Sequence, residues 1–243
     1  MIKVEQLSKH FDSIKAIDNI SFEAKDGRIT GLLGPNGAGK STTFRILYTV
    51  FTADRGHVVV DGINIFDEPL QARQRLGVLP HNSGLYQHLT AEENIAYYGR
   101  LYGLSKDHTN KRVKELLELL DMNDIARQKA KGFSQGQRIK VALARALIHQ
   151  PKNIILDEPT NGLDVMSTRA LRAYIKRLRD EGVCVLFSSH VMQEIAALCD
   201  DIVILNHGKV VVSGTPDDIK SHTGINDLED AFVSILGDEE GVE

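Results

Sequence analysis

A glycine-rich segment occupies residues 34–41 and reads Gly34-Pro35-Asn36-Gly37-Ala38-Gly39-Lys40-Ser41. It fits the pattern GxxxxGK followed by Ser or Thr, and it lies between an apolar run at 29–33 and a helical pattern at 42–48. Glycines at this place let backbone N–H groups close around a phosphate at a helix N-terminus, where the helix dipole favours an anion. We expect Lys40 to reach the β- and γ-phosphates and the Ser41 hydroxyl to bind Mg²⁺. The alternative is a glycine-rich turn with an incidental lysine, which the flanking strand and helix make the weaker interpretation.

The remaining sequence predicts an α/β fold around this segment. The short apolar runs at 154–156 and 183–188 each follow a helical pattern, which is typical of a parallel sheet. The first third is rich in strands instead, with hairpins predicted at Lys25-Asp26-Gly27 and at Asp61-Gly62.

A helical stretch interrupts this pattern. Thr90 and Glu93 form a predicted capping box, and apolar residues at helical spacing follow it. We therefore expect a single domain over 1–243. Its core with the β subdomain spans 1–85 and 133–220, its inserted helical subdomain spans about 86–132, and its C-terminal tail spans 221–243.

Two carboxylates end the apolar strand at 154–156. Ligands bind at the carboxyl ends of strands in parallel sheets, so Asp157 and Glu158 are predicted site residues. Asp157 is expected to hold Mg²⁺, usually through a water molecule, and Glu158 to face the water that attacks the γ-phosphate. Two acids in a solvated turn are the alternative, which the phosphate loop disfavours.

The residues Phe133-Ser134-Gln135-Gly136-Gln137 open the next predicted helix. Ser134 and Gln137 form a capping box, which by itself is a sufficient explanation. Gly136 also lets an anion approach the free N–H groups of the first turn. The residues alone leave both interpretations open.

The order of these motifs resembles that of the ATP-binding subunits of ABC transporters over essentially the whole chain. Phe133–Gln137 is similar to the LSGGQ signature of that family, with Phe133 for leucine and Gln135 for the first glycine. The resemblance implies an ABC-type ATPase: a RecA-like P-loop NTPase core with an antiparallel β subdomain and an inserted α-helical subdomain. It also implies ATP and Mg²⁺ as ligands, and a homodimer in which Ser134, Gly136 and Gln137 complete the ATP site of the second copy.

Other residues take their roles from the same resemblance. Residues Gly34–Thr42 would bind the phosphates, and Phe11 would stack on the adenine. A buried core phenylalanine is the alternative for Phe11. His190 would contact the γ-phosphate as a catalytic residue beside Glu158 and Lys40, and Asn161–Asp164 would meet the opposite subunit.

One position departs from the family. The family has glutamine after the strand that ends near Leu79-Pro80, where it senses Mg²⁺ and contacts the transport subunit, and this sequence has His81-Asn82. We carry the metal-binding role over to His81, although an imidazole differs from an amide in reach and in its response to pH.

Composition bears on partners and location. The formal net charge is −4, from 29 Lys and Arg against 33 Asp and Glu, so no nucleic-acid partner is expected. No apolar run approaches the roughly 18 residues of a membrane-spanning helix. We therefore expect a cytoplasmic protein, held at the inner face of the cell membrane by a separate transmembrane permease.

The segments Ser83–Tyr86 and Asp227–Phe232 are similar to those of the type-2 exporter group, which has sodium- and drug-extruding members. Sodium extrusion is the favoured cargo prediction, although an ATPase subunit does not contact the cargo. The alternatives are an importer subunit, an ABC ATPase of translation or DNA repair, and a regulator that binds ATP without hydrolysis. Glu158 argues against the last, because a switch without turnover needs no base.

Overall fold

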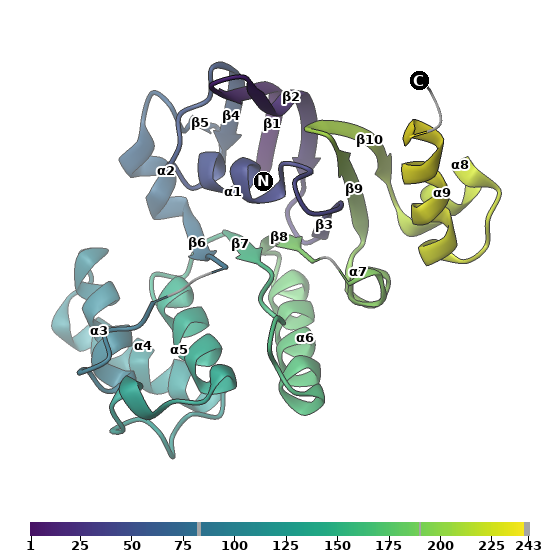
Figure 1. Cartoon of the computed structure of the whole chain (residues 1–243). Coiled ribbons are helices and arrows are strands. Elements are labelled where there is room, and N and C mark those ends of the chain that lie inside the picture. Colours follow the sequence, from purple (N-terminus) through teal and green to yellow (C-terminus); the bar gives the residue numbers. More distant parts are fainter. Residues whose placement is uncertain (82–83, 190, 241–243) are drawn as a thin grey trace.

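The structure is a computed structural model that describes residues 1–81, 84–189 and 191–240, with only the backbone described for 238–240. Two sheets form its upper half, and helices cover the lower face of the second sheet (Figure 1). The first sheet has the strand order β2-β1-β4-β5 and is antiparallel. Its strands are β1 (Ile2–Phe11), β2 (Ile14–Ala24), β4 (Arg55–Val60) and β5 (Ile63–Asn64).

The second sheet has the order β10-β9-β3-β8-β7-β6. It is parallel from β9 to β6, and β10 pairs antiparallel with β9 at one edge. Its strands are β3 (Ile29–Leu33), β6 (Leu76–Leu79), β7 (Asn153–Asp157), β8 (Cys184–Ser188), β9 (Asp201–Asn206) and β10 (Lys209–Gly214). This confirms the predicted α/β fold with a parallel sheet.

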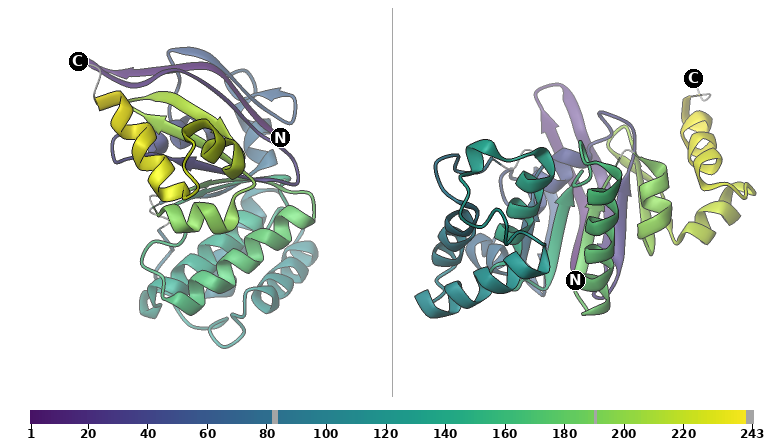
Figure 2. Two further views of the ribbon diagram at one scale, coloured as in Figure 1. Left: turned by 90° about the vertical axis from the view of Figure 1, so that its right-hand side faces the viewer. Right: turned by 90° about the horizontal axis from the view of Figure 1, so that it is seen from below.

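Apart from α1 and α2, the α-helices fall into three groups. A separate lobe holds α3, α4 and α5 beside the β6 edge, α6 and α7 lie under the sheet, and α8 and α9 lie beside β10 at the far edge (Figures 1 and 2). The bounds are α1 (Lys40–Leu47), α2 (Pro69–Arg75), α3 (Ala91–Leu101), α4 (Lys106–Leu119), the 3₁₀ helix η1 (Ala130–Gly132), α5 (Gln135–Leu147), α6 (Val165–Asp180), α7 (Met192–Leu198), α8 (Pro216–Thr223) and α9 (Leu228–Glu240). Within the described residues, no helix is long and apolar enough to span a bilayer.

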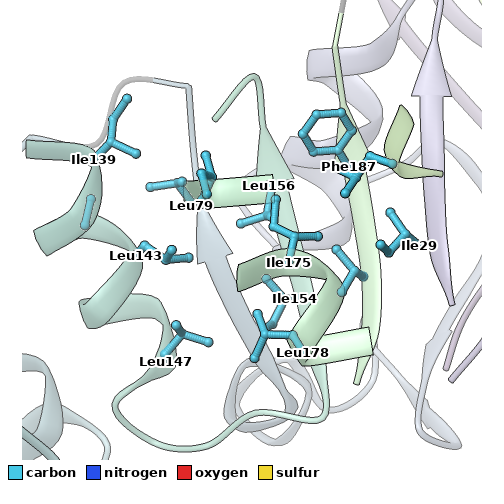
Figure 3. Packing of buried hydrophobic residues seen from close by; sticks show 14 of the residues in the cluster. Ile29, Leu79, Ile139, Leu143, Leu147, Ile154, Leu156, Ile175, Leu178 and Phe187 are labelled. Atoms are coloured by element: carbon cyan, nitrogen blue, oxygen red, sulfur yellow. The ribbon is translucent and has the colours of Figure 1, made fainter. Parts of the chain in front are cut away.

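The parallel sheet separates two apolar cores. Alternate side chains of β7 enter opposite cores, because successive residues of a strand face opposite sides: Ile154 and Leu156 pack below the sheet, and Ile155 packs above it. The lower core is closed by Leu143 of α5 and Ile175 of α6, which face the sheet together (Figure 3). The upper core packs α1 and the antiparallel sheet on the other face.

One predicted turn is confirmed and another is wrong. Asp61-Gly62 joins paired strands, with Val60 opposite Ile63. Lys25-Asp26-Gly27 does not form a hairpin, because β2 and β3 belong to different sheets. All five residues of β3 are buried between β8 and β9, and the Gly27 N–H donates to Gly182 O at 3.1 Å, so the turn is tied to the loop before β8.

Candidate functional site

The phosphate loop joins β3 to α1 and has a shape that only glycine allows at two positions. Gly39 has φ 103°, and a Cβ there would lie 2.6 Å from the carbonyl oxygen of Ala16. A Cβ on Gly34 would lie 2.2 Å from the carbonyl oxygen of Leu205. Helix α1 begins at Lys40 with no side-chain cap, so the N–H groups of its first turn keep their capacity to bind an anion.

Lys40 is buried at the start of α1 and is held by the loop itself. Its Nζ donates to the carbonyl oxygens of Gly34 at 2.6 Å and Pro35 at 2.9 Å. Burial lowers the pKa of Lys40 below its ordinary value, and the carboxylates of Glu158 and Asp157 oppose that shift. The cation is therefore in the electrostatic field of both predicted site acids.

Asp157 and Glu158 lie where β7 ends, and a hydroxyl on the neighbouring strand orders both. Ser188 Oγ donates to Asp157 Oδ1 at 2.8 Å, and it accepts from the backbone N–H of Glu158 at 3.0 Å. Burial raises the pKa of Asp157, and the hydrogen bond from Ser188 opposes the rise. Glu158 has φ 49°, a left-handed conformation that is uncommon for a non-glycine residue.

The His81 imidazole lies against the predicted base. Its Nδ1 is 3.2 Å from Glu158 Oε2. His81 follows the end of β6, which pairs with β7, so the strand order accounts for this contact. The metal-binding role of His81 stays a prediction, and the neighbouring Asn82 lies outside the described residues.

A cavity of about 390 Å³ opens beside these groups. Its lining comes from the ends of β6 and β7 and from the first turns of α5, and includes His81, Asp157, Glu158, Gln135 and Arg138. The two carboxylates therefore line the same cavity as the start of α5, the helix that begins at the FSQGQ segment of this subunit.

The capping box predicted at that helix start is present. Ser134 Oγ accepts from Gln137 N–H at 3.3 Å, and Gln137 Oε1 accepts from Ser134 N–H at 2.9 Å. A Cβ on Gly136 would lie 3.3 Å from Ser167 Oγ, which is a tight contact. The capping interpretation is confirmed, and the predicted contact of these residues with a partner's nucleotide stays a prediction.

Phe11 is 38% exposed, so its interpretation as a buried core residue is wrong. It ends β1, pairs with Ile14, and meets Phe51 edge-on with ring centroids 5.3 Å apart. The same hairpin end carries Ala16, whose carbonyl approaches Gly39 of the phosphate loop. Phe11 thus lies on the hairpin that borders the loop, and its stacking on adenine stays a prediction.

The residues present fit Mg²⁺ together with a nucleotide. Among the described residues, no group of three or more His, Cys, Asp or Glu side chains could hold a metal ion. Mg²⁺ does not need such a group, because proteins usually bind it through one or two carboxylates, waters and substrate phosphates. The carboxylate of Asp157 and the hydroxyl of Ser41, in the first turn of α1 beside Thr42, are oxygen donors of that kind.

His190, predicted to contact the γ-phosphate, lies outside the described residues. Ser188 was missed, because its contact with Asp157 depends on β8 pairing with β7, which no local pattern predicts.

A profile of the family described as "ABC transporter" matches residues 17–161. The chain is 39% identical to the "ABC transporter ATP-binding protein NatA" of Bacillus subtilis (strain 168) over 97% of this chain and 98% of that protein. It is 37% identical to the "Linearmycin resistance ATP-binding protein LnrL" of the same organism, over 92% of this chain and 72% of that protein.

Solved structures of ATP-binding cassettes have the same fold as this chain. An "ATP binding subunit of ABC transporter" superimposes with a TM-score of 0.90 at 30% identity, covering 97% of this chain and 99% of that one. The dimeric ATP-binding cassette MJ0796, in a post-hydrolysis state bound to ADP and Pi, gives a TM-score of 0.80 at 28% identity, covering 88% and 98%.

Proposed function

The chain belongs to the ABC transporter family as an ATP-binding, ATP-hydrolysing subunit, and we propose that it powers export through a separate membrane permease. The observation that carries the site is the meeting of three groups. Lys40 is held by the phosphate loop and lies in the electrostatic field of Asp157 and Glu158. These two acids lie at the end of β7, which is two strands away from β3 in the sheet.

Each of these groups has a defined part in hydrolysis. Lys40 and the N–H groups of α1 bind and orient the phosphates. Asp157 and Ser41 would hold Mg²⁺, which would supply neutralisation of the phosphate charge. Glu158 takes the proton of the attacking water, a role that contributes about 10²–10⁴-fold in rate. His81, 3.2 Å from the Glu158 carboxylate, orients that base.

A second copy completes the site. The MJ0796 cassette is described as a dimer with ADP and Pi bound. By analogy, Ser134, Gly136 and Gln137 of one subunit would face the nucleotide of the other, in an isologous dimer with two shared sites. ATP binding closes this dimer and hydrolysis reopens it.

The helical lobe is the proposed contact with the permease. Tyr98 of α3 and Tyr102, which follows that helix, line a hollow of about 210 Å³. Arg145 of α5 and Pro80, the residue before His81, also line it. A permease segment seated there would touch both the lobe and the chain next to the base.

Export is supported by relatives named for resistance to linearmycin and doxorubicin. Sodium as the cargo stays a prediction.

The substitution Glu158→Gln tests this proposal. The amide keeps the shape of the carboxylate but cannot take a proton, so turnover should fall by about 10²-fold or more while ATP still binds. ATP should then hold the variant as a dimer, measured by size-exclusion chromatography with light scattering. Glu181→Gln, which changes an exposed carboxylate paired with Arg177 on α6, is the matched control. A Glu158→Gln variant that hydrolyses ATP at the control's rate would remove Glu158 from the role of base.

A further inference from the structure

A buried carboxylate lies behind the site. Glu194 lies on α7 and is only 6% exposed, and its carboxylate accepts hydrogen bonds from residues outside that helix. Its Oε2 accepts from Thr160 Oγ1 at 2.5 Å and from Ser189 Oγ at 2.9 Å. Its Oε1 is 3.4 Å from Arg172 Nη2 of α6. One oxygen therefore binds two hydroxyls, and the other faces a cation.

The two hydroxyls belong to the two loops that follow neighbouring strands. Thr160 comes two residues after Glu158, at the start of the loop that continues into Asn161–Asp164. Ser189 follows directly on Ser188, the residue that binds Asp157 and the Glu158 backbone. Both hydroxyls are buried, at 9% and 2% exposure. Glu194 thus connects the β7 loop to the β8 loop from below.

The packing of α7 fixes the position of the Glu194 carboxylate relative to the two hydroxyls. Helix α7 packs against β3 on one side and against α9 on the other. Ile195 and Leu198 of α7 share the lower core with Ala231 and Ile235 of α9. A buried carboxylate is stable only while it keeps its partners, so movement of either hydroxyl away from Glu194 is costly.

We propose that Glu194 is a positioning residue that makes Thr160, after β7, and Ser189, after β8, move as one unit. This rests on the proposed function and its shared-site dimer, and on the family resemblance, which implies that Asn161–Asp164 meets the second subunit. The end of β8 orders the acids of the site. Closure of the dimer at the first loop is then transmitted through Thr160, Glu194 and Ser189 to the hydrolytic groups. Glu194 is not among the residues that line the cavity beside the acids, so it acts through the two hydroxyls.

Kinetics of Glu194→Gln test the positioning role. The amide loses the charge that faces Arg172 and weakens the acceptor shared by the two hydroxyls, and hydrogen bonds to charged groups are the strong ones. We expect kcat to fall by about tenfold or more and KM for ATP to stay within about twofold. Glu181→Gln, the same chemical change at the exposed residue that follows α6, should leave both unchanged. A lower free energy of unfolding in urea with wild-type kcat would mean that Glu194 only stabilises the fold, and would overturn the proposal.

Thr160 provides a second test that leaves Glu194 in place. Thr160→Val removes the hydroxyl at nearly constant volume and should lower kcat by a similar factor, whereas Thr160→Ser keeps the donor and should restore most of the activity. Combining Thr160→Val with Glu194→Gln should add little to either change, because both break one connection. Fully additive losses would show that the two residues act independently.

A binding measurement separates this inference from the proposed function. In the Glu158→Gln background, adding Glu194→Gln should raise the ATP concentration needed for dimerisation by about tenfold, while monomer affinity for ADP stays unchanged. If Glu158→Gln alone fails to dimerise with ATP, the proposed shared site is wrong. The positioning role of Glu194 is contradicted by a different pair of results. In that case Glu158→Gln and the double variant dimerise at the same ATP concentration, and kcat of Glu194→Gln equals that of the Glu181→Gln control.

Discussion

His149 shows how far burial can change a single ionisable group in this fold. Its ring stacks on Tyr102, with centroids 3.6 Å apart and planes 7° from parallel. Its Nε2 is 3.0 Å from the carbonyl oxygen of Leu76, so Nε2 carries the proton of the neutral ring. Its Nδ1 is buried without a hydrogen-bond partner among the described residues. Burial lowers the pKa of His149 to about 4, against an ordinary value of 6.5.

The sign of the resulting pH dependence follows from that shift. The folded state binds fewer protons than the unfolded state between pH 6.5 and about 4, so stability is fully present above pH 6.5 and is lost as pH falls toward 4. His149→Phe keeps a stacked ring and removes the titration. Between pH 7 and pH 5, wild type should lose about 2 kcal/mol more unfolding free energy than this variant in urea titrations. The exposed His57→Gln should follow wild type, and parallel slopes for His149→Phe and wild type would contradict the prediction.

Helix α5 is the element that joins three parts of the molecule. Its first residue follows the cap at Ser134, its apolar face enters the lower core with Leu143, and Arg145 contacts Tyr98 of α3 within the helical lobe. Arg145 donates to Gly84 O at 2.7 Å and lies over the ring of Tyr98, 3.9 Å from its centroid. Rotation of α5 would therefore move its capped end, the sheet contact and the lobe together.

Ser134→Arg tests whether the α5 cap belongs to a shared site. The long cation should block the face proposed to meet the partner's nucleotide, so ATP-driven dimerisation of the Glu158→Gln variant should be lost while the monomer still binds ATP. The lost cap should itself cost about 1 kcal/mol of stability. Ser105→Arg is the control, because Ser105 caps α4 by the same type of bond, from His108 N–H at 3.3 Å. Loss of ATP binding by the Ser134→Arg monomer, or dimerisation equal to that of the control, would make Ser134 a local cap alone.

At the scale of the whole molecule, the exposed apolar side chains of the helical lobe are far from those of the C-terminal helices. Leu101 on α3 is 63% exposed, and Val233 on α9 is 62% exposed. The two helices lie at opposite edges of the parallel sheet (Figure 1). A permease that docks on the helical lobe should respond to a change at Leu101 and not to a change at Val233.

Leu101→Glu places a charge beside the proposed docking hollow, and Val233→Glu makes the same change at the opposite edge. ATP hydrolysis by the isolated subunit should be unchanged in both, because neither residue is near the phosphate loop. Stimulation by the membrane-embedded permease should fall by about tenfold or more for Leu101→Glu only, since burial of an unpaired charge at an interface costs several kcal/mol. Equal stimulation of both variants would place the permease elsewhere.

Local structure in this protein was predictable from the sequence because it depends on groups a few residues apart. The capping boxes at Thr90 and Ser134 each close within three residues. The hairpin at Asp61-Gly62 needs only a turn and two adjacent strands. The fold class and the ends of β3 and β7, where site residues follow a strand, come from patterns of the same short range.

The tertiary structure decided what depends on which strands become neighbours. The turn at Lys25–Gly27 was predicted as a hairpin, but β3 lies between β8 and β9, more than 150 residues further along the chain. The same strand order brings Ser188 to Asp157 and His81 to Glu158. These contacts carry no local sequence signal, because their free energy comes from burying both sides of one parallel sheet.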